Sequence, residues 1–196
     1  MRHIRPALVL IALFTLLTGI VLPLAFTGVA TAIVPGVANG SLVIRDGNAV
    51  GSALIGQAFT SDRYFHPRPS ATTDTDPADP AKTIPAPYNA SSSGASNLGA
   101  TSKALIDRVT ADLQALGPAP VPADAVTTSA SGLDPDISPA NAARQAARVA
   151  AARGLPEDRV RAFVAAATAR SWLGVFGEPR VNVLALNLAL DEAGAR

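Results

Sequence analysis

Residues 7–26 read ALVLIALFTLLTGIVLPLAF, and no charged residue lies between Arg5 and Arg45. A helix rises ~1.5 Å per residue, so twenty residues reach about 30 Å, the thickness of the hydrocarbon core of a bilayer. The rest of the chain is polar and Pro-rich and contains no second run of this kind. The sequence therefore predicts one transmembrane helix over residues 7–30, preceded by a short segment of residues 1–6.

The distribution of basic residues predicts how this helix is oriented. Arg2 and Arg5 precede the apolar run. The positive-inside rule therefore places segment 1–6 in the cytoplasm and residues 31–196 in an extracytoplasmic domain. A cleavable signal peptide is the alternative, because Ala30-Thr31-Ala32 resembles a small-residue cleavage site. The apolar run is longer than the usual signal core of about 7–15 residues, which favours an uncleaved anchor.

Composition limits what the exposed part can be. The chain has 196 residues, of which 48% are hydrophobic but only 5% aromatic, and its net charge is +1. One modest domain with a thin, Ala-rich core fits these values, and the lack of basic runs argues against nucleic-acid binding. The sequence contains no cysteine, which excludes disulfides, Cys-ligated metals and Cys nucleophiles.

Gly19 and Pro23 interrupt the apolar run. Membrane helices accept such residues where neighbouring helices repack around them, and small residues allow close helix approach. Two readings stay open, a lone helix with a kink or a helix that leans on a partner. On the second reading Gly19 and Pro23 are candidates for a partner interface.

The exposed domain is expected to be of the α+β class. Apolar stretches on either side of Asp46-Gly47 predict a β-hairpin that runs from Leu42 to Phe59. Residues 67–96 are rich in Pro, Ser, Thr, Asp and Gly and predict a long flexible loop.

About three helices are predicted after this loop. Ser102 or Thr101 is expected to cap a helix that ends at Leu116 and carries one apolar stripe, and Ser138-Pro139 opens a helix to about Arg153. Pro156 opens another, whose expected buried residues are Val160, Phe163, Val164 and Ala167. Alternating leucines predict a half-buried C-terminal strand over residues 181–190, with an Ala- and Leu-rich helix as the alternative.

Motifs for catalysis and metal binding are weak. Gly94 and Gly99 have the spacing of a phosphate loop, but Ala100 stands where that loop needs lysine, so a glycine-rich turn is the better interpretation. The Asp residues of the Pro-rich loop lack the glycine and the terminal glutamate of a calcium site. We therefore expect no metal site.

Ser129 and Ser131 lie in a small, flexible segment, as a nucleophile can. A serine nucleophile needs a base, and the only histidine away from the predicted membrane helix is His66. A membrane-anchored extracytoplasmic serine hydrolase is the alternative function on this pattern. A turn before the Ser138 cap is the structural interpretation of the same residues.

The segment 64–70, YFHPRPS, concentrates aromatic residues, arginine and proline in a chain that is poor in aromatics. Tyr, Phe and Arg are enriched at protein interfaces, and proline lowers the entropy lost on binding. Tyr64, Phe65, His66 and Arg68 are therefore candidates for a partner interface. The alternative is a rigid corner whose aromatic side chains plug the base of the hairpin.

Several blocks, in order along the chain, resemble one family. They read RPAL at 5–8, GSALIGQ at 51–57, YFHPRPSA at 64–71, SNLG at 96–99, SASGLD at 129–134, then Gln145 and Arg148, and LNLALD at 186–191. Together they resemble the C subunits of bacterial Kdp potassium-transporting P-type ATPases. The resemblance runs nearly from end to end. It departs from the family's pattern after the span, where no aromatic residue stands, and after Gly99, where prolines are usual.

The resemblance implies a non-catalytic subunit of a high-affinity, ATP-driven potassium uptake complex. Its partners would be a potassium-conducting subunit, an ATP-hydrolysing subunit and a small membrane subunit, together with membrane lipid. It would aid assembly and act as a catalytic chaperone that raises the affinity of the pump for ATP, with Gln145 as the nucleotide-related residue. No cofactor would be bound firmly by the chain itself, and ATP would be reached through the complex. The chain would be a single-pass protein of the bacterial inner membrane.

ATP is cytoplasmic, whereas the charge rule places the domain outside. A domain outside cannot touch cytoplasmic ATP, so any effect on ATP affinity has to reach the nucleotide site as coupling through the assembly. On this argument Gln145 is an ordinary polar residue of a helix. A self-assembling or lipid-associated structural protein is a third function class that the residues alone leave open.

Overall fold

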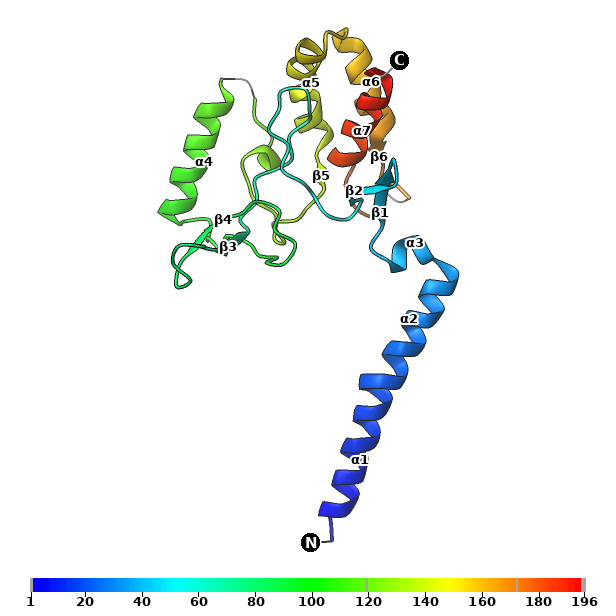
Figure 1. The fold of residues 1–196 in the computed structure, drawn as a ribbon. Helices are drawn as coiled ribbons and strands as arrows, with labels where there is room; N and C mark the ends of the chain where they lie inside the picture. Colours follow the sequence, from blue (N-terminus) through cyan, green and yellow to red (C-terminus); the bar gives the residue numbers. More distant parts are fainter. Residues whose placement is uncertain (1, 119, 172, 195–196) are drawn as a thin grey trace. The chain divides into compact units, whose positions relative to one another are not determined.

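The computed structural model describes residues 2–118, 120–171 and 173–194. The chain divides into two compact units, residues 1–52 and residues 53–196 (Figure 1). The first unit holds the predicted membrane helix and the β-hairpin, and the second holds the rest of the domain. The α+β class with a single N-terminal apolar helix is confirmed.

The apolar helix of the first unit spans Ile4–Ile33, 30 residues, and is long and apolar enough to cross a membrane. It consists of α1 (Ile4–Leu16), a π-helical segment η1 (Leu17–Val21) and α2 (Leu22–Ile33). Pro23 explains the π segment, because proline lacks the N–H that would bond to the carbonyl of Gly19 and its ring crowds that carbonyl. The two residues singled out in the sequence are therefore coupled as i and i+4 partners.

A short helix α3 (Pro35–Ala38) and a hairpin complete the first unit. Strand β1 (Leu42–Arg45) pairs antiparallel with β2 (Asn48–Ser52), and both turn residues, Asp46 and Gly47, have positive φ (50° and 78°). This is the backbone that Asp-Gly favours in two-residue hairpin turns. The predicted hairpin is confirmed, but its second strand ends at Ser52 and not at Phe59.

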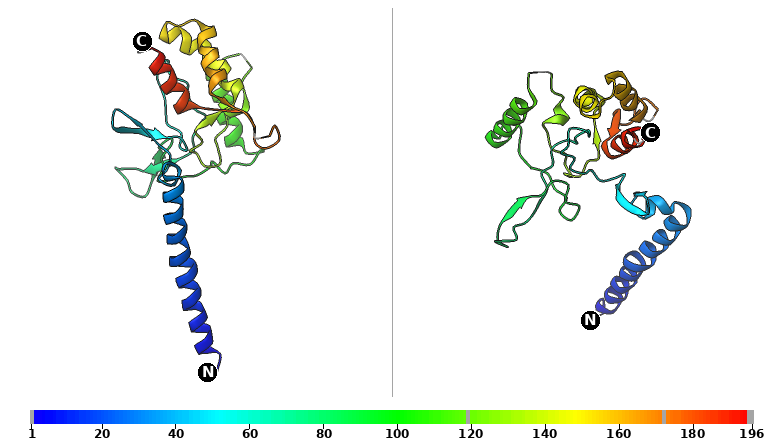
Figure 2. Two further views of the ribbon diagram at one scale, coloured as in Figure 1. Left: turned by 90° about the vertical axis from the view of Figure 1, so that its right-hand side faces the viewer. Right: turned by 45° about the horizontal axis from the view of Figure 1, so that its top comes forward.

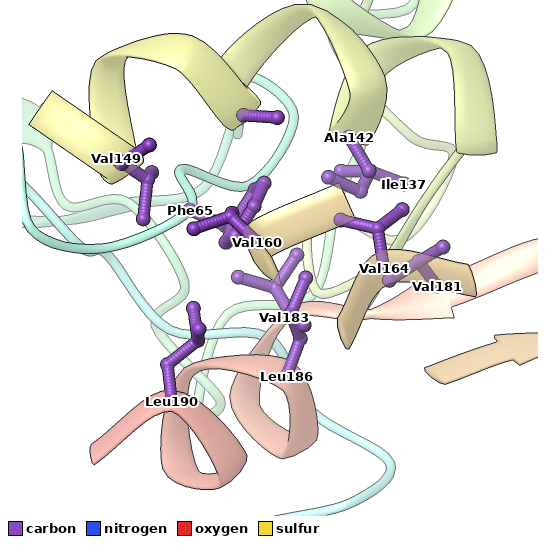
Figure 3. Packing of buried hydrophobic residues seen from close by; sticks show 12 residues of the cluster. Phe65, Ile137, Ala142, Val149, Val160, Val164, Val181, Val183, Leu186 and Leu190 are labelled. Atoms are coloured by element: carbon purple, nitrogen blue, oxygen red, sulfur yellow. The ribbon is translucent and has the colours of Figure 1, made fainter. Parts of the chain in front are cut away.

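The core of the second unit is built by three helices, α5 (Pro139–Arg153), α6 (Glu157–Ala167) and α7 (Val183–Gly194). A small antiparallel sheet accompanies them in the order β5-β7-β6, with bounds Asp136–Ile137, Arg180–Asn182 and Thr168–Ala169. Figure 3 shows side chains from the three helices meeting around Phe65.

The predicted helices α5 and α6 form where capping and periodicity placed them. Ser138 Oγ accepts the N–H of Asn141 at the start of α5, and Gly154 ends the helix with left-handed backbone (φ 65°). On α6, Val160 and Val164 are buried, while Phe163 and Ala167 pack against the core from partly buried positions. The expected buried face of α6 is confirmed.

The C-terminal strand over residues 181–190 is a wrong prediction beyond its first two residues. Strand β7 ends at Asn182, and the leucines lie on α7. The buried residues of α7 follow a helical period that the alternating leucines obscured: Val183, Leu184, Leu186, Asn187 and Leu190. Asn182 Oδ1 accepts the N–H of Ala185 at 3.0 Å and caps the helix. Ala and Leu are also strong helix formers, whereas no β-branched residue follows Val183 in this run.

Two parts of the second unit lie outside this core. The loop region 67–96 contains a short antiparallel pair, β3 (Thr73–Thr75) and β4 (Thr83–Pro85), which the sequence did not predict. Helix α4 (Lys103–Leu116) begins after Ser102 as expected, but none of its residues is buried. Figures 1 and 2 show α4 standing apart from helices α5–α7.

Truncation of a core leucine tests this account of the core. Leu186 is completely buried, so Leu186→Ala removes buried apolar surface and leaves a cavity. We expect the free energy of unfolding of the domain to fall by about 2–5 kcal/mol, measured by denaturant titration. Leu113→Ala on α4, where the side chain is 40% exposed, is the matched control and should change stability by no more than about 0.5 kcal/mol. Equal effects of the two substitutions would contradict the assignment of the core to α5–α7.

Candidate functional site

Two side-chain amides hold the segment that begins at Tyr64. Asn187 on α7 accepts the N–H of Phe65 at 2.8 Å and donates to the Phe65 carbonyl at 3.0 Å. Gln145 on α5 does the same for the next residue, with 2.7 Å from the His66 N–H and 3.0 Å to the His66 carbonyl. Each amide thus pairs with both backbone groups of one residue, as a neighbouring strand would. We call this arrangement the amide clamp.

The hydrogen-bonding capacity of Gln145 is fully used within the chain. Besides His66, its Oε1 accepts from Arg148 Nη2 at 2.8 Å and its Nε2 donates to Asn141 Oδ1 at 3.1 Å. An amide offers two acceptor positions and two donor hydrogens, and all four are occupied. The residue is 7% exposed. Contact with an external ligand would require breaking one of these bonds.

The cavity beside Gln145 is small. Its volume is about 90 Å³, and it is lined by His66, Pro67, Leu116, Ala125, Asn141, Arg144, Gln145 and Arg148. Pockets for cofactor-sized molecules usually measure about 300–1,000 Å³. The cavity is therefore too small for such a molecule, and Gln145 packs between α5 and the segment that begins at Tyr64.

Arg148 binds backbone carbonyls of the same segment and of the residues just before it. Its Nη2 donates to the Tyr64 carbonyl at 3.0 Å and its Nη1 to the Asp62 carbonyl at 2.8 Å. The ring of His66 lies close by, with Nε2 at 3.1 Å from the Ser61 carbonyl and 3.4 Å from Arg148 Nη1. Burial lowers the pKa of His66 from 6.5, opposed by the hydrogen bond to Ser61, and the positive charge of Arg148 lowers it further.

Tyr64 and Phe65 are anchored by different contacts. The Tyr64 hydroxyl donates to Asp191 at 3.2 Å, and the Arg153 guanidinium lies 5.1 Å from the centre of its ring. Arg153 in turn forms an ion pair of 2.8 Å with Asp191. Phe65 has no exposed surface and belongs to the core cluster.

Arg68 joins the segment to the loop around residue 130. Its Nη1 forms an ion pair of 2.8 Å with Asp134, and its Nε donates to the Thr127 carbonyl at 3.3 Å. The Arg68 carbonyl accepts the hydroxyl of Tyr88 at 2.6 Å. Burial raises the pKa of that hydroxyl, so Tyr88 remains a donor over the whole physiological range.

The structure brings Gln145, Tyr64, Phe65 and His66 together through the amide clamp and Arg148, whereas the side chain of Arg68 bonds to a separate set of residues around Asp134. The expectation that Phe65 contacts a partner is wrong, because a side chain with no exposed surface is not available to one. Phe65 is a structural residue, as the rigid-corner alternative predicted, but it packs in the α5–α7 core and not at the base of the hairpin. Gly19 and Pro23 belong to the first unit, and their role as interface candidates stays a prediction.

The residues of the alternative hydrolase are not assembled. The His66 ring contacts the Ser61 carbonyl and Arg148, while the hydroxyls of Ser129 and Ser131 lie 3.4 Å from each other. Among the described residues no group of three or more His, Cys, Asp or Glu could hold a metal ion. The loop carboxylates instead accept nearby backbone N–H groups, as Asp76 does from Ala78 at 2.8 Å.

Sequence reasoning missed Asn187, Asn141, Arg153 and Asp191 as parts of this network. One signal was present, since Asn187 is the only polar residue in the run LALNLAL at 184–190. A lone amide in an apolar helix face is buried, and a buried amide needs partners. The partners lie 122 positions away in the chain, which no local pattern can reveal.

Comparison with known proteins places the chain in a family. A family model described as K⁺-transporting ATPase, c chain, matches residues 4–192. The chain belongs to the KdpC family. Proteins named potassium-transporting ATPase KdpC subunit are 61% identical in Methylobacterium nodulans and 60% identical in Methylorubrum populi, each match covering 100% of both chains. A third, from Rhodopseudomonas palustris, is 60% identical over 98% of this chain and 99% of its own. The resemblance inferred from the sequence blocks is confirmed.

Replacement of the Gln145 amide tests the clamp in this KdpC-family chain. Gln145→Leu keeps the approximate size of the side chain but leaves the partly buried N–H and carbonyl of His66 without their amide partner. We expect the free energy of unfolding to fall by about 1–3 kcal/mol, the cost of leaving a buried polar group unsatisfied. The control is Gln114→Leu on α4, where the glutamine is exposed. A neutral Gln145→Leu would argue against a structural role of the amide.

The lowered pKa of His66 predicts a pH dependence of stability. Below about pH 6.5 the unfolded chain takes up a proton on this residue before the folded chain does, so stability falls as the pH decreases towards the folded pKa. His66→Gln should flatten the stability curve between about pH 5 and 7.5 in thermal melts. His3→Gln, outside the folded domain, is the control. An unchanged curve in His66→Gln would contradict the assignment.

Proposed function

We propose that this chain is a non-catalytic accessory subunit of a potassium-transporting ATPase, anchored by the helix Ile4–Ile33 with its folded domain on the extracytoplasmic side. The match over residues 4–192 to the c chain of K⁺-transporting ATPases carries the proposal. The apolar helix and the two arginines before it support the anchor and its orientation. Its companions are the potassium-conducting and ATP-hydrolysing subunits and a small membrane subunit.

The state of the polar residues supports a role in contact and assembly. Gln145 and His66, which can both donate and accept hydrogen bonds, form their bonds within the chain. Their contacts stiffen the domain and join α5 and α7 to the segment after Tyr64. A stiff domain on a single anchor is suited to presenting a fixed surface to another subunit, because little conformational entropy is then lost on docking.

Helix α4 offers that surface. One edge of its apolar stripe is exposed, with Ile106 54%, Leu113 40% and Leu116 36% exposed, while Leu105 and Val109 on the same stripe are partly buried. An isolated helix of 14 residues is marginal in water, and contiguous exposed apolar surface usually marks an interaction site. We propose that this stripe, more than segment 64–68, contacts the companion subunits, with the exposed parts of Tyr64, His66 and Arg68 as secondary contacts.

The effect on ATP affinity is proposed to be indirect. ATP is cytoplasmic, so an extracytoplasmic domain acts on the nucleotide site only through coupling across the assembled complex. In this proposal Gln145 is a positioning residue that keeps the docking domain in shape. A direct bond from Gln145 to a nucleotide would need one of its bonds to His66, Arg148 or Asn141 to break.

Retention in the complex tests the proposal. Ile106→Ser combined with Leu113→Ser should weaken co-purification of the companion subunits about tenfold or more, because apolar contact area is lost. The matched control is Ala104→Ser with Ala111→Ser on the opposite face of α4. ATP-dependent hydrolysis by the remaining complex should then need higher ATP concentrations. Full retention of the stripe variant in the complex would contradict docking through α4. Unchanged potassium transport after removal of the whole chain would contradict the subunit role.

A further inference from the structure

The charge-free part of the chain extends well beyond the membrane helix. The helix ends at Ile33, yet the next charged residue is Arg45. The eleven residues 34–44 between them fold into α3 and most of β1. A segment that leaves the bilayer directly into water has no physical reason to avoid charge over this length, whereas one that stays in the headgroup region has.

This segment also leaves large apolar side chains uncovered within the first unit. The exposed fractions of Ile33 and Val37 are 72% and 66%, and those of Leu42 and Ile44 are both 58%. Leu42 and Ile44 are two positions apart on β1 and therefore lie on the same face of the hairpin. Together with Val34 they continue the lipid-exposed apolar surface of the span without a charged interruption.

The hairpin is oriented by a contact at its base. Ser52 Oγ donates to the Gly40 carbonyl at 2.7 Å, which ties the end of β2 to the chain leaving α3. The charged and polar residues Arg45, Asp46 and Asn48 are at the opposite end, in and beside the turn. The hairpin thus has an apolar base next to the membrane helix and a polar tip.

The length of the helix agrees with this arrangement. At ~1.5 Å per residue, 30 residues measure about 45 Å, against about 30 Å of hydrocarbon. Tilting by up to about 40° reduces the height to roughly 34 Å. The end of the helix then lies at the bilayer surface. No aromatic residue stands between Phe26 and Phe59, so the usual aromatic belt cannot set the depth of this end.

We infer that residues 33–44 form an interfacial collar whose apolar side chains, Ile33, Val34, Val37, Leu42 and Ile44, are immersed in the headgroup–acyl boundary of the phospholipid bilayer. The inference rests on the anchor of the proposed function and not on the pump. The collar continues the lipid-facing surface of the span and takes the place of an aromatic belt. It fixes the depth at which the chain leaves the bilayer and keeps the polar hairpin tip in water.

Spin labels on single cysteines test the collar, because the chain contains no cysteine of its own. The full-length chain is labelled in turn at Val37→Cys, Leu42→Cys, Ile44→Cys and Asn48→Cys and reconstituted into vesicles of phosphatidylethanolamine and phosphatidylglycerol. Ala25→Cys inside the span is the lipid control. Accessibility to oxygen and to a water-soluble nickel complex is measured for each label. All labelled positions are exposed, so the label itself should not disturb folding.

We expect the labels at Val37, Leu42 and Ile44 to resemble the one at Ala25, with nickel accessibility several-fold lower than at Asn48. Protected Ala25 together with collar labels as accessible as Asn48 would overturn the collar and leave the anchor intact. Collar labels that the nickel complex reaches in vesicles, but that neither oxygen nor the nickel complex reaches in the assembled pump, would overturn the collar in favour of a contact with protein. Nickel access at Ala25 as well would show that the anchor of the proposed function itself fails.

Discussion

The folded domain depends on two side-chain amides that bind the backbone of neighbouring residues. Asn187 holds both polar groups of Phe65, and Gln145 holds both polar groups of His66. Without these bonds a segment that has no strand partner could not run through the interior, because its backbone groups would be buried and unsatisfied. The clamp allows Phe65 to enter the α5–α7 core, and among the described residues it is the one fully buried aromatic side chain in a cluster built mainly from Val, Ala and Leu.

The same interaction explains why the polar residues of this KdpC-family chain form a scaffold. All four hydrogen-bonding positions of the Gln145 amide are occupied. Arg148 donates to the Tyr64 carbonyl, and Arg153 donates to the Arg63 carbonyl and to the carboxylate of Asp191. Large apolar side chains are exposed on α4, as at Ile106 and Leu113, and on the segment after the N-terminal apolar helix, as at Val37 and Leu42. The polar side chains around Tyr64 are thus used within the chain, whereas these apolar side chains remain exposed.

Much of the local structure was predictable because its causes are local. Asp46-Gly47 favours the backbone of a hairpin turn, Ser138-Pro139 caps α5, and Gly154 ends it. The failure at residues 181–190 has a local cause too, since leucine at alternate positions has the period of a strand and hides the helical face that Val183 and Asn187 complete. The cap formed by Asn182 was the signal that a helix begins there. The candidate residues Tyr64, His66, Arg68 and Gln145 were identified from the sequence, but the bonds between Gln145 and His66, and the partners of Tyr64 and Arg68, were not.

The sequence by itself determined the N-terminal apolar helix, the helices α5 and α6, the hairpin turn and, through its ordered blocks, the family. These features depend on hydrophobicity, period, caps and motifs that are read over short stretches of chain. Only the tertiary structure decided that Phe65 is core and not interface, that Gln145 and Asn187 act as a pair, and that the stripe of α4 is left uncovered. Each of these is settled by which distant segments meet, and contacts between residues 79 to 122 positions apart leave no pattern in the chain itself.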